Sequence, residues 1–150
     1  VKDINNINVR SAAAALGVSV EEKKSDEPVT FNEWLHVQVY NGPTKVVSAG
    51  GRFFGSPNNP RIVRLFSLPV EIPIAGTLLL IRNHDRPGIV GHLGTVLGNH
   101  GVNIANMSLA RDAAGGQALT VLHLDSAPPQ AALDELSRDP AITSARVVTL

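Results

Sequence analysis

The sequence predicts an α+β protein in two parts, a β-rich first half and a second half with the element order βαββαβ. Residues 33–40 alternate between apolar and polar side chains, which is typical of a half-exposed strand. The second half instead interleaves apolar strand runs with two helical patterns. Because Pro73 and Gly76 punctuate residues 70–76, we expect an extended connector there and two domains, residues 1–75 and 76–150.

One short helix and four strands are expected in the first half. The helix is rich in alanine and ends before Gly17, and the turn Asn41-Gly42-Pro43 separates the second strand from the third. The adjacent Gly50 and Gly51 predict a bulge or the close approach of another part of the chain. We place the helix at residues 9–16 and the strands at residues 18–24, 33–40, 45–54 and 61–66.

The second half opens with a strand at residues 77–82, whose continuous apolar run predicts burial of both faces. A helix at residues 87–100 follows, with Pro87 in its first position and Gly101 as a left-handed cap. Its glycines, Gly91, Gly94 and Gly98, predict the close approach of another backbone. A strand at 102–111, a hairpin loop at 112–116, a strand at 117–125, a helix at 128–138 and a strand at 142–150 complete a ferredoxin-like split βαβ fold.

Composition excludes several classes of protein. The chain carries 13 acidic and 13 basic side chains, so bulk charge favours neither nucleic acid nor a membrane surface as a partner. It has no cysteine, which excludes disulfide and thiolate chemistry and fits a cytoplasmic location. The longest apolar run, residues 72–81, is interrupted and about half as long as a membrane-spanning helix requires. Because the chain begins at Val1 without an initiator Met, we expect a longer parent protein.

The turn Asn83-His84-Asp85-Arg86-Pro87-Gly88 is the candidate ligand site. An acidic residue at a helix N-terminus stabilises the helix by about 0.3–1 kcal/mol, so capping alone is one interpretation. Exposed N–H groups beside short polar side chains equally suit a small charged ligand. Asn103 favours the ligand, because a two-fold partner can bring it from the opposite sheet edge to this turn. Asp85 would then hold an ammonium, and Asn83 and Asn103 a carboxylate or hydroxyl, as an amino acid requires.

Other charged groups have competing interpretations. The first half is locally basic through Lys45, Arg52, Arg61 and Arg64, and we expect either an anion site, formed by Lys45, Arg52 and Arg61, or a solvated face. His92 and His100 lie on the polar side of the helix, and we interpret them as solvated rather than as metal ligands. No nucleophile–base set, carboxylate pair or phosphate-binding glycine loop stands out, so we expect no catalytic residue, metal site or cofactor in this chain.

The second half contains Asp85-Arg86-Pro87-Gly88-Ile89-Val90, followed by Leu97 and Gly101-Val102-Asn103-Ile104. These residues resemble the signature of the ACT domain, most closely that of the D-3-phosphoglycerate dehydrogenase family. Two stretches of the first half, Gly51-Arg52-Phe53-Phe54-Gly55 and Pro60-Arg61-Ile62-Val63, resemble the intervening domain of the longer members. The start of that domain is also similar to Asn8-Val9 through Leu16-Gly17.

This resemblance implies the regulatory portion of an oxidoreductase that oxidises 3-phosphoglycerate with NAD in serine biosynthesis, the catalytic and NAD-binding portion being absent here. It also implies a homodimer or homotetramer in which L-serine, the feedback inhibitor, binds between paired ACT domains. The implied contacts are Asn83, Asp85 and Asn103, with Pro87, Gly88 and Ile104 beside them. Asn83 stands where relatives carry His or Tyr, and Asp85 where Asn is common. Arg61 matches a basic position linked to anion binding.

Two alternatives to this interpretation remain open. A serine dehydratase can pair a similar intervening domain with an ACT domain, and an ACT domain can also serve as an interaction module without a ligand. Titration with amino acids separates the ligand-free module from the two enzymes. The sequence that precedes Val1 separates the enzymes, because a dehydrogenase requires a dinucleotide-binding domain there.

Overall fold

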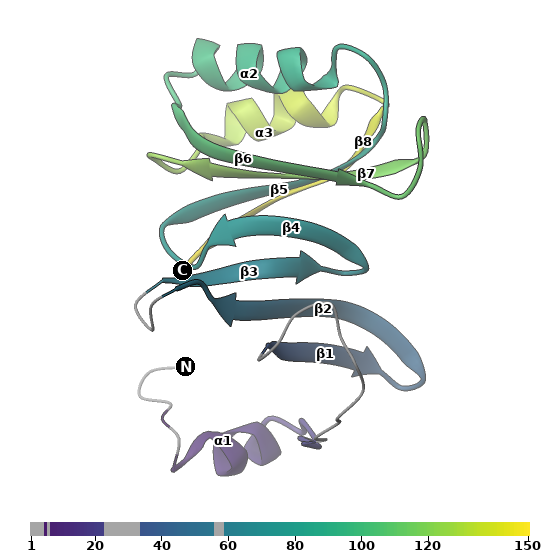
Figure 1. Ribbon diagram of the computed structural model, residues 1–150. Coiled ribbons are helices and arrows are strands. Elements are labelled where there is room, and N and C mark those ends of the chain that lie inside the picture. Colours follow the sequence, from purple (N-terminus) through teal and green to yellow (C-terminus); the bar gives the residue numbers. More distant parts are fainter. Residues whose placement is uncertain (1–4, 6, 23–33, 56–58) are drawn as a thin grey trace. The chain divides into compact units, whose positions relative to one another are not determined.

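Eight strands in two antiparallel sheets, together with three helices, make up the described part of the chain (Figure 1). The computed structural model describes residue 5 and residues 7–22, 34–55 and 59–150. The chain divides into two compact units, Val1–Asn32 and Glu33–Leu150. None of the helices in these ranges is long and apolar enough to cross a membrane.

The first unit contains α1 (Val9–Ala15), in agreement with the predicted helix at residues 9–16. Gly17 ends it as predicted: its φ of 71° lets Val18 N donate back to Ala13 O at 2.9 Å. The strand predicted at residues 18–24 is wrong over 18–22, and residues 23–24 lie outside the described residues. Within the described part, no other strand pairs with the backbone of this segment, so its alternating apolar residues do not form part of a sheet.

Sheet A is a four-stranded meander in the order β1-β2-β3-β4. The first three strands agree with the predicted ones. The fourth replaces the connector expected at residues 70–76, and that expectation was wrong: β4 pairs with β3 along its length, and its two prolines are tolerated because it lies at the sheet edge. The strands are β1 (Leu35–Asn41), β2 (Thr44–Phe53), β3 (Pro60–Leu65) and β4 (Leu68–Pro73).

The bulge predicted at Gly50 and Gly51 is present, because the register between β2 and β3 shifts between these two residues. The predicted close approach of another part of the chain also occurs, at Gly50. The Trp34 ring lies over it, and any Cβ at this position would overlap the ring carbons.

Sheet B has the strand order β6-β7-β5-β8, with α2 and α3 together on one face (Figure 1). This is the predicted ferredoxin-like βαββαβ arrangement. Pro87 precedes the helix instead of opening it, because Gly88, at φ 87°, is the N-cap. The elements are β5 (Thr77–His84), α2 (Ile89–Asn99), β6 (Ile104–Arg111), β7 (Gln117–Leu124), α3 (Gln130–Ser137) and β8 (Ile142–Thr149).

Strand β5 is buried on both faces, as its apolar run predicts. Leu79 and Ile81 point to the helices, whereas Leu78 belongs to a second cluster with Val70 and Ile72 of β4. Sheet A therefore covers the face of sheet B that the helices leave open. The predicted domain boundary near residue 75 falls between β4 and β5 and stays a prediction, because both sheets belong to the unit Glu33–Leu150.

The three glycines of α2 have no close neighbour in the chain. At Gly91, Gly94 and Gly98 an added Cβ would meet no atom within 4 Å. The close approach of another backbone, expected from these glycines, is therefore absent among the described residues.

We expect Ile72→Ala to lower the free energy of unfolding by about 2–5 kcal/mol, because Ile72 is fully buried where the two sheets meet. Ile74→Ala is the control, since Ile74 is 42% exposed and its loss should cost less than about 1 kcal/mol. Urea unfolding measures both variants. Equal losses would contradict the packing of β4 against sheet B.

Candidate functional site

Asn83 lies at the end of β5, on the face that α2 and α3 cover. It is fully buried, and its Nδ2 donates to the His84 carbonyl oxygen at 2.9 Å. Its Oδ1 is buried without a hydrogen-bond partner among the described residues. A buried oxygen without a donor costs roughly 1–3 kcal/mol, so this atom calls for a donor from outside the described chain.

Thr120 of β7 carries a second buried polar atom without a partner in the described residues, its Oγ1. It pairs with Ile81, while the neighbouring Ala118 pairs with Asn83. Since alternate residues share a face, Thr120 and Asn83 lie in adjacent rows on the helix side. Thr120 is not among the predicted site residues, although a polar residue within the apolar run Ala118-Leu119-Thr120-Val121-Leu122 is a usable signal.

Asp85, the residue expected to hold an ammonium, already accepts two hydrogen bonds. Its Oδ2 receives Arg111 Nη1 at 2.6 Å and the backbone N–H of Gly115 at 3.1 Å. These two bonds, first that of Arg111, hold the pKa of Asp85 below its ordinary value of 3.8. Its Oδ1 has no hydrogen bond within the described residues, so half of the carboxylate remains available.

The hairpin between β6 and β7 presents both donors to Asp85. Asp112 Oδ1 accepts the N–H groups of Ala113 and Gln117 at 2.6 and 2.8 Å, and Gly115 takes a left-handed φ of 74°. This confirms the loop predicted at residues 112–116 and fixes its shape. Arg111 and Gly115 were missed as site residues because nothing in the sequence links them to a turn 26 or more positions earlier.

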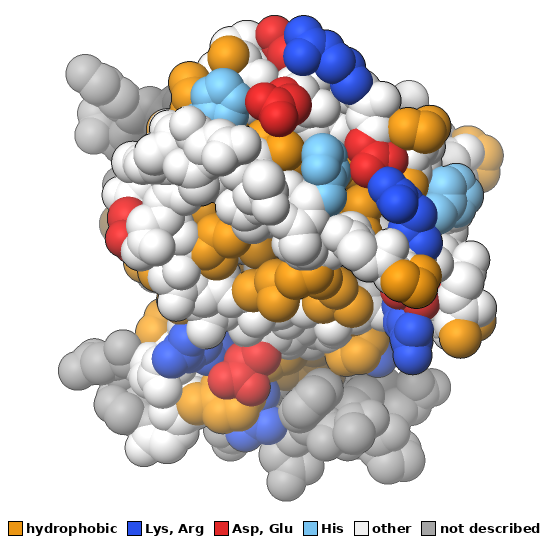
Figure 2. All heavy atoms as spheres, turned by 90° about the horizontal axis from the view of Figure 1, so that it is seen from above, with side chains coloured by type: hydrophobic (Ala, Val, Ile, Leu, Met, Phe, Trp, Pro, Cys, Tyr) orange, Lys and Arg blue, Asp and Glu red, His pale blue; other side chains and the backbone are white. Residues whose placement is uncertain are grey.

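Arg86 ties the same turn to the far end of α3 by an ion pair with Asp139. The Asp139 side chain is only 10% exposed and also accepts the Ala141 N–H at 2.9 Å. That backbone hydrogen bond, followed by the charge of Arg86, lowers the pKa of Asp139. Figure 2 looks onto this helix side of sheet B, where acidic, basic and histidine side chains interleave.

The two helix histidines are not simply solvated, contrary to our interpretation of their positions. His100 Nε2 lies 3.0 Å from Glu135 Oε2, and His92 Nε2 is buried 3.8 Å from Asp139 Oδ2. His100 therefore links α2 to α3, whereas His92 Nε2 has no hydrogen-bond partner among the described residues. Among the described residues, no group of three or more His, Asp and Glu side chains lies close enough to hold a metal ion.

Asn103 stands at the opposite end of sheet B from the turn. Its Nδ2 donates to Asp125 Oδ2 at 2.7 Å. The neighbouring Ile104 is half-buried and aligns with the start of β5, whereas Arg111, at the other end of β6, aligns with Asn83 through β7. Ile104 and Arg111 are seven positions apart along the strand, roughly 20 Å. Asn103 and the turn of the same chain are therefore far apart. The sequence led us to expect this separation, because we assigned Asn103 of a two-fold partner to the turn.

The start of α2 has no side-chain cap. Gly88 is its N-cap, in a left-handed conformation, and no side-chain cap hydrogen bond is present among the described residues. The capping interpretation of the turn is therefore not realised by Asp85, whose carboxylate faces the hairpin instead.

The basic residues of sheet A form two separate groups. Arg52 and Arg61 are directly opposite each other on β2 and β3, with Arg52 stacked 4.8 Å from the Phe54 ring. Lys45 instead pairs with Tyr40, near the other end of β2, so it does not join them. Arg61 Nε donates to Asn59 Oδ1 at 3.0 Å.

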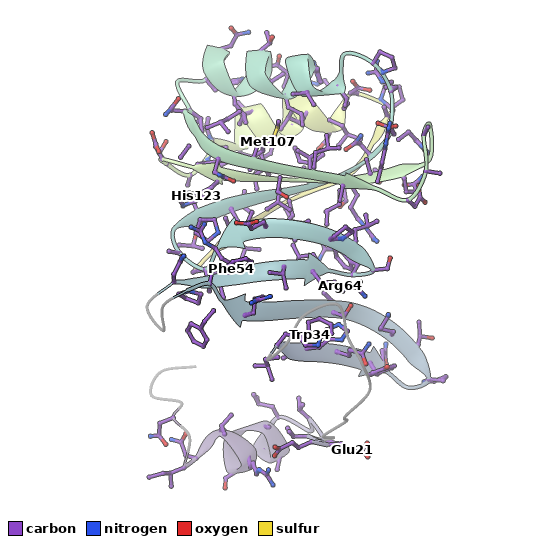
Figure 3. All side chains as sticks on the ribbon, in the orientation of Figure 1. Glu21, Trp34, Phe54, Arg64, Met107 and His123 are labelled. Atoms are coloured by element: carbon purple, nitrogen blue, oxygen red, sulfur yellow. The ribbon has the colours of Figure 1, made fainter. Side chains whose placement is uncertain are left out.

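The second group lies around Trp34. Its ring stacks on His36 with 4.8 Å between centroids, and Arg64 lies 5.9 Å from it (Figure 3 labels Trp34 and Arg64). Burial, and then the charges of Arg64 and Lys45, lower the pKa of His36. His36 is therefore the neutral member of a cationic face.

The model of the ACT domain matches residues 77–141. Residues 77–141 are an ACT domain. The match begins at the first residue of β5 and covers both helices of sheet B, so the candidate turn lies within the ACT domain.

The chain also resembles D-3-phosphoglycerate dehydrogenases beyond its ACT domain. It is 29% identical to that of Archaeoglobus fulgidus over 99% of this chain and 28% of the relative. It is 31% identical to that of Synechocystis sp., over 98% and 26%, and 32% identical to that of Mycobacterium tuberculosis, over 82% and 23%. The predicted resemblance is confirmed, and the chain spans about a quarter of the length of these relatives.

The hydrogen bond from Arg111 predicts a measurable titration. Because the folded state favours ionised Asp85, the pair stabilises the fold above pH about 4, and this contribution is lost as pH falls through the lowered pKa. We expect Arg111→Met to raise the pKa of Asp85 towards 3.8, whereas Arg146→Met, on the opposite face of sheet B, leaves it unchanged. Carboxyl-detected NMR measures the pKa of Asp85 in each variant. An identical Asp85 titration in both variants would contradict the pairing.

Proposed function

We propose that the chain is the regulatory portion of a D-3-phosphoglycerate dehydrogenase and binds L-serine, or a close small amino acid, between two ACT domains. The relatives named above carry the enzyme's name over about four times this length. Oxidation of 3-phosphoglycerate with NAD then belongs to the rest of the parent protein. The ligand proposal rests on one observation. Asn103 lies beside one end of β6, and Arg111, which bonds Asp85, lies at the other end, so the two halves of the site can meet only across two chains.

An antiparallel pairing of two β6 strands would close that separation. β6 is an edge strand, and its helix-side residues Met107 and Leu109 are 44% and 40% exposed (Figure 3 labels Met107). A two-fold axis between Met107 and Ser108 pairs Ile104 of one chain with Arg111 of the other. The partner's Asn103 then arrives next to Arg111, beside the carboxylate of Asp85.

The polar atoms of this composite site suit an amino acid. Asp85 Oδ1 would accept the ammonium, and Asn83 Oδ1, buried without a partner among the described residues, would accept a hydroxyl. The partner's Asn103 would give up its hydrogen bond to Asp125 and offer a neutral amide to the ligand. Pro87, Gly88 and the uncapped N–H groups at the start of α2 line the same side, and Ile104 of the partner closes the site.

A second candidate function concerns Arg52 and Arg61. Arg52 and Arg61 lie directly opposite each other on neighbouring strands, so an anion at this position would meet two guanidinium groups at once. Asn59 and the Phe54 ring hold the two guanidinium groups in place. We propose that this pair binds phosphate or a phosphorylated acid weakly, without Lys45.

The ligand proposal predicts a pattern of affinities. Asp85→Ala should weaken L-serine by roughly ten- to a hundredfold, because a charge-assisted hydrogen bond is lost. Asn103→Ala should weaken it less, since its bond is neutral. Asn99→Ala, at an exposed asparagine of the same domain, is the control and should change nothing. Calorimetry with L-serine, D-serine, glycine and L-alanine tests the proteins, and no saturable heat from any ligand would overturn the site.

The dimer proposal predicts that the chain is dimeric at micromolar concentration and that Leu109→Lys makes it monomeric, because a charge on an edge strand opposes pairing. Val148→Lys is the matched control on the other edge strand, β8, where the side chain is 39% exposed. Sedimentation measures both. A monomeric wild type, or a dimer broken only by Val148→Lys, would contradict pairing through β6.

The anion proposal predicts that phosphate binding to the wild type weakens steeply with salt and is largely lost in Arg61→Ala. Arg146→Ala removes the same charge from sheet B and should bind phosphate as the wild type does. Isothermal titration at two ionic strengths decides. Equal phosphate binding by the two variants would show that Arg52 and Arg61 form only a solvated cationic face.

A further inference from the structure

Arg111, Ala118 and Asn83 lie in one row across the helix side of sheet B. β7 contributes Ala118, which pairs with Arg111 of β6 on one side and with Asn83 of β5 on the other. β6 and β5 are therefore two strand spacings apart, roughly 10 Å. Only a long side chain can cross this distance, and Ala118, which is 3% exposed, is a small residue between the two strands in this row.

The crossing delivers a cation to the proposed ligand position. Arg111 Nη1 bonds Asp85 Oδ2, and the Asp85 side chain is 17% exposed against 52% for Arg111. A guanidinium group has five N–H donors in a planar fork. Only Nη1 has a hydrogen-bond partner among the described residues, so the Nε and Nη2 edge of the fork stays accessible.

The backbone N–H groups at the start of α2 are neutral donors, and neither Asn83 nor the partner's Asn103 offers a carboxylate a charged one. Asn83 Nδ2 already donates to the His84 carbonyl, and the open atom of this amide, Oδ1, accepts hydrogen bonds. A carboxylate needs donors, so it cannot use that oxygen. The partner's Asn103 offers one neutral amide. Arg111 offers a charged, bidentate donor pair beside the Asp85 oxygen that is free for an ammonium.

We infer that Arg111 binds the α-carboxylate of the ligand, so that Asp85 and Arg111 together recognise a zwitterion. This inference rests on the proposed binding of an amino acid at the same turn. Asp85 keeps Arg111 on its Oδ2 and takes the ligand's ammonium on its Oδ1. The pair thus presents one negative and one positive group to the two charged groups of a free amino acid, and Asn83 is left to select the side-chain hydroxyl.

The chemistry sets the selectivity. A free α-amino acid satisfies both charges, whereas an amide of the same amino acid, or the decarboxylated amine, leaves the outer donors of Arg111 without an anion. L-Serinamide keeps the ammonium and hydroxyl of L-serine and replaces only the carboxylate by a neutral group. Comparing these two ligands therefore isolates the contact that Arg111 makes.

The test is calorimetry of L-serine and L-serinamide with the 150-residue wild type, Arg111→Met and the control Arg146→Met. Arg146 lies on the opposite face of the same sheet, paired with Leu80. We expect Arg111→Met to weaken L-serine about ten- to a hundredfold and to leave L-serinamide nearly unchanged, so that the preference for serine disappears. Arg146→Met should keep it.

Each other outcome overturns the inference in a distinguishable way. Equal weakening of both ligands would assign Arg111 the role of positioning Asp85, and tighter binding would make it a competitor of the ammonium. If the wild type binds neither ligand, the amino-acid site itself fails. Arg111→Lys provides a second variant that keeps the charge without the planar fork. It should retain only part of the preference for L-serine, and full retention would contradict the bidentate contact.

Discussion

The burial of β5 on both faces is the constraint on which the rest of the structure depends. One face of the strand joins the helices in a cluster around Leu79 and Ile81, and the other joins sheet A through Leu78. The last buried residue of the strand is Asn83. The chain leaves the core there, so the polar turn that follows is positioned by the whole fold.

This position also explains why the turn is rich in interactions. Asp85 meets the β6–β7 hairpin through Arg111 and Gly115, and Arg86 meets the end of α3 through Asp139. Ionic contacts from two different parts of the domain therefore hold two consecutive residues of the turn. A ligand at Asp85 would act on a turn that is already connected to both layers of the ACT domain.

The turn lies one residue from a contact with sheet A. Arg82, on the face of β5 opposite Asn83, lies 4.3 Å from the Phe66 ring in the β3–β4 turn. Phe66 has a φ of 56°, unusual for a bulky residue, and Ser48 holds its backbone by two hydrogen bonds of 2.7 Å. The end of β5 is thus packed against a well-fixed part of the other sheet.

Local patterns in the sequence were sufficient for the ACT domain and insufficient for the pairing of its polar residues. The continuous run before Asn83 and the cap at Gly101 are local signals, and the elements they predicted are present. β4 was missed because prolines read as breakers when the edge position that tolerates them is unknown. The contact between Arg111 and Asp85 depends on strand order, which no local pattern contains.

The central claim is that the proposed ligand site needs two chains, and mixing two defective variants tests it most directly. Asp85→Ala and Asn103→Ala homodimers should each bind L-serine weakly. If the site is composite, each mixed dimer contains one site with both wild-type residues, so mixing the two variants should restore wild-type affinity in calorimetry. If Asp85 and Asn103 of a single chain served the same ligand, every site would keep one defect, and mixing would restore nothing.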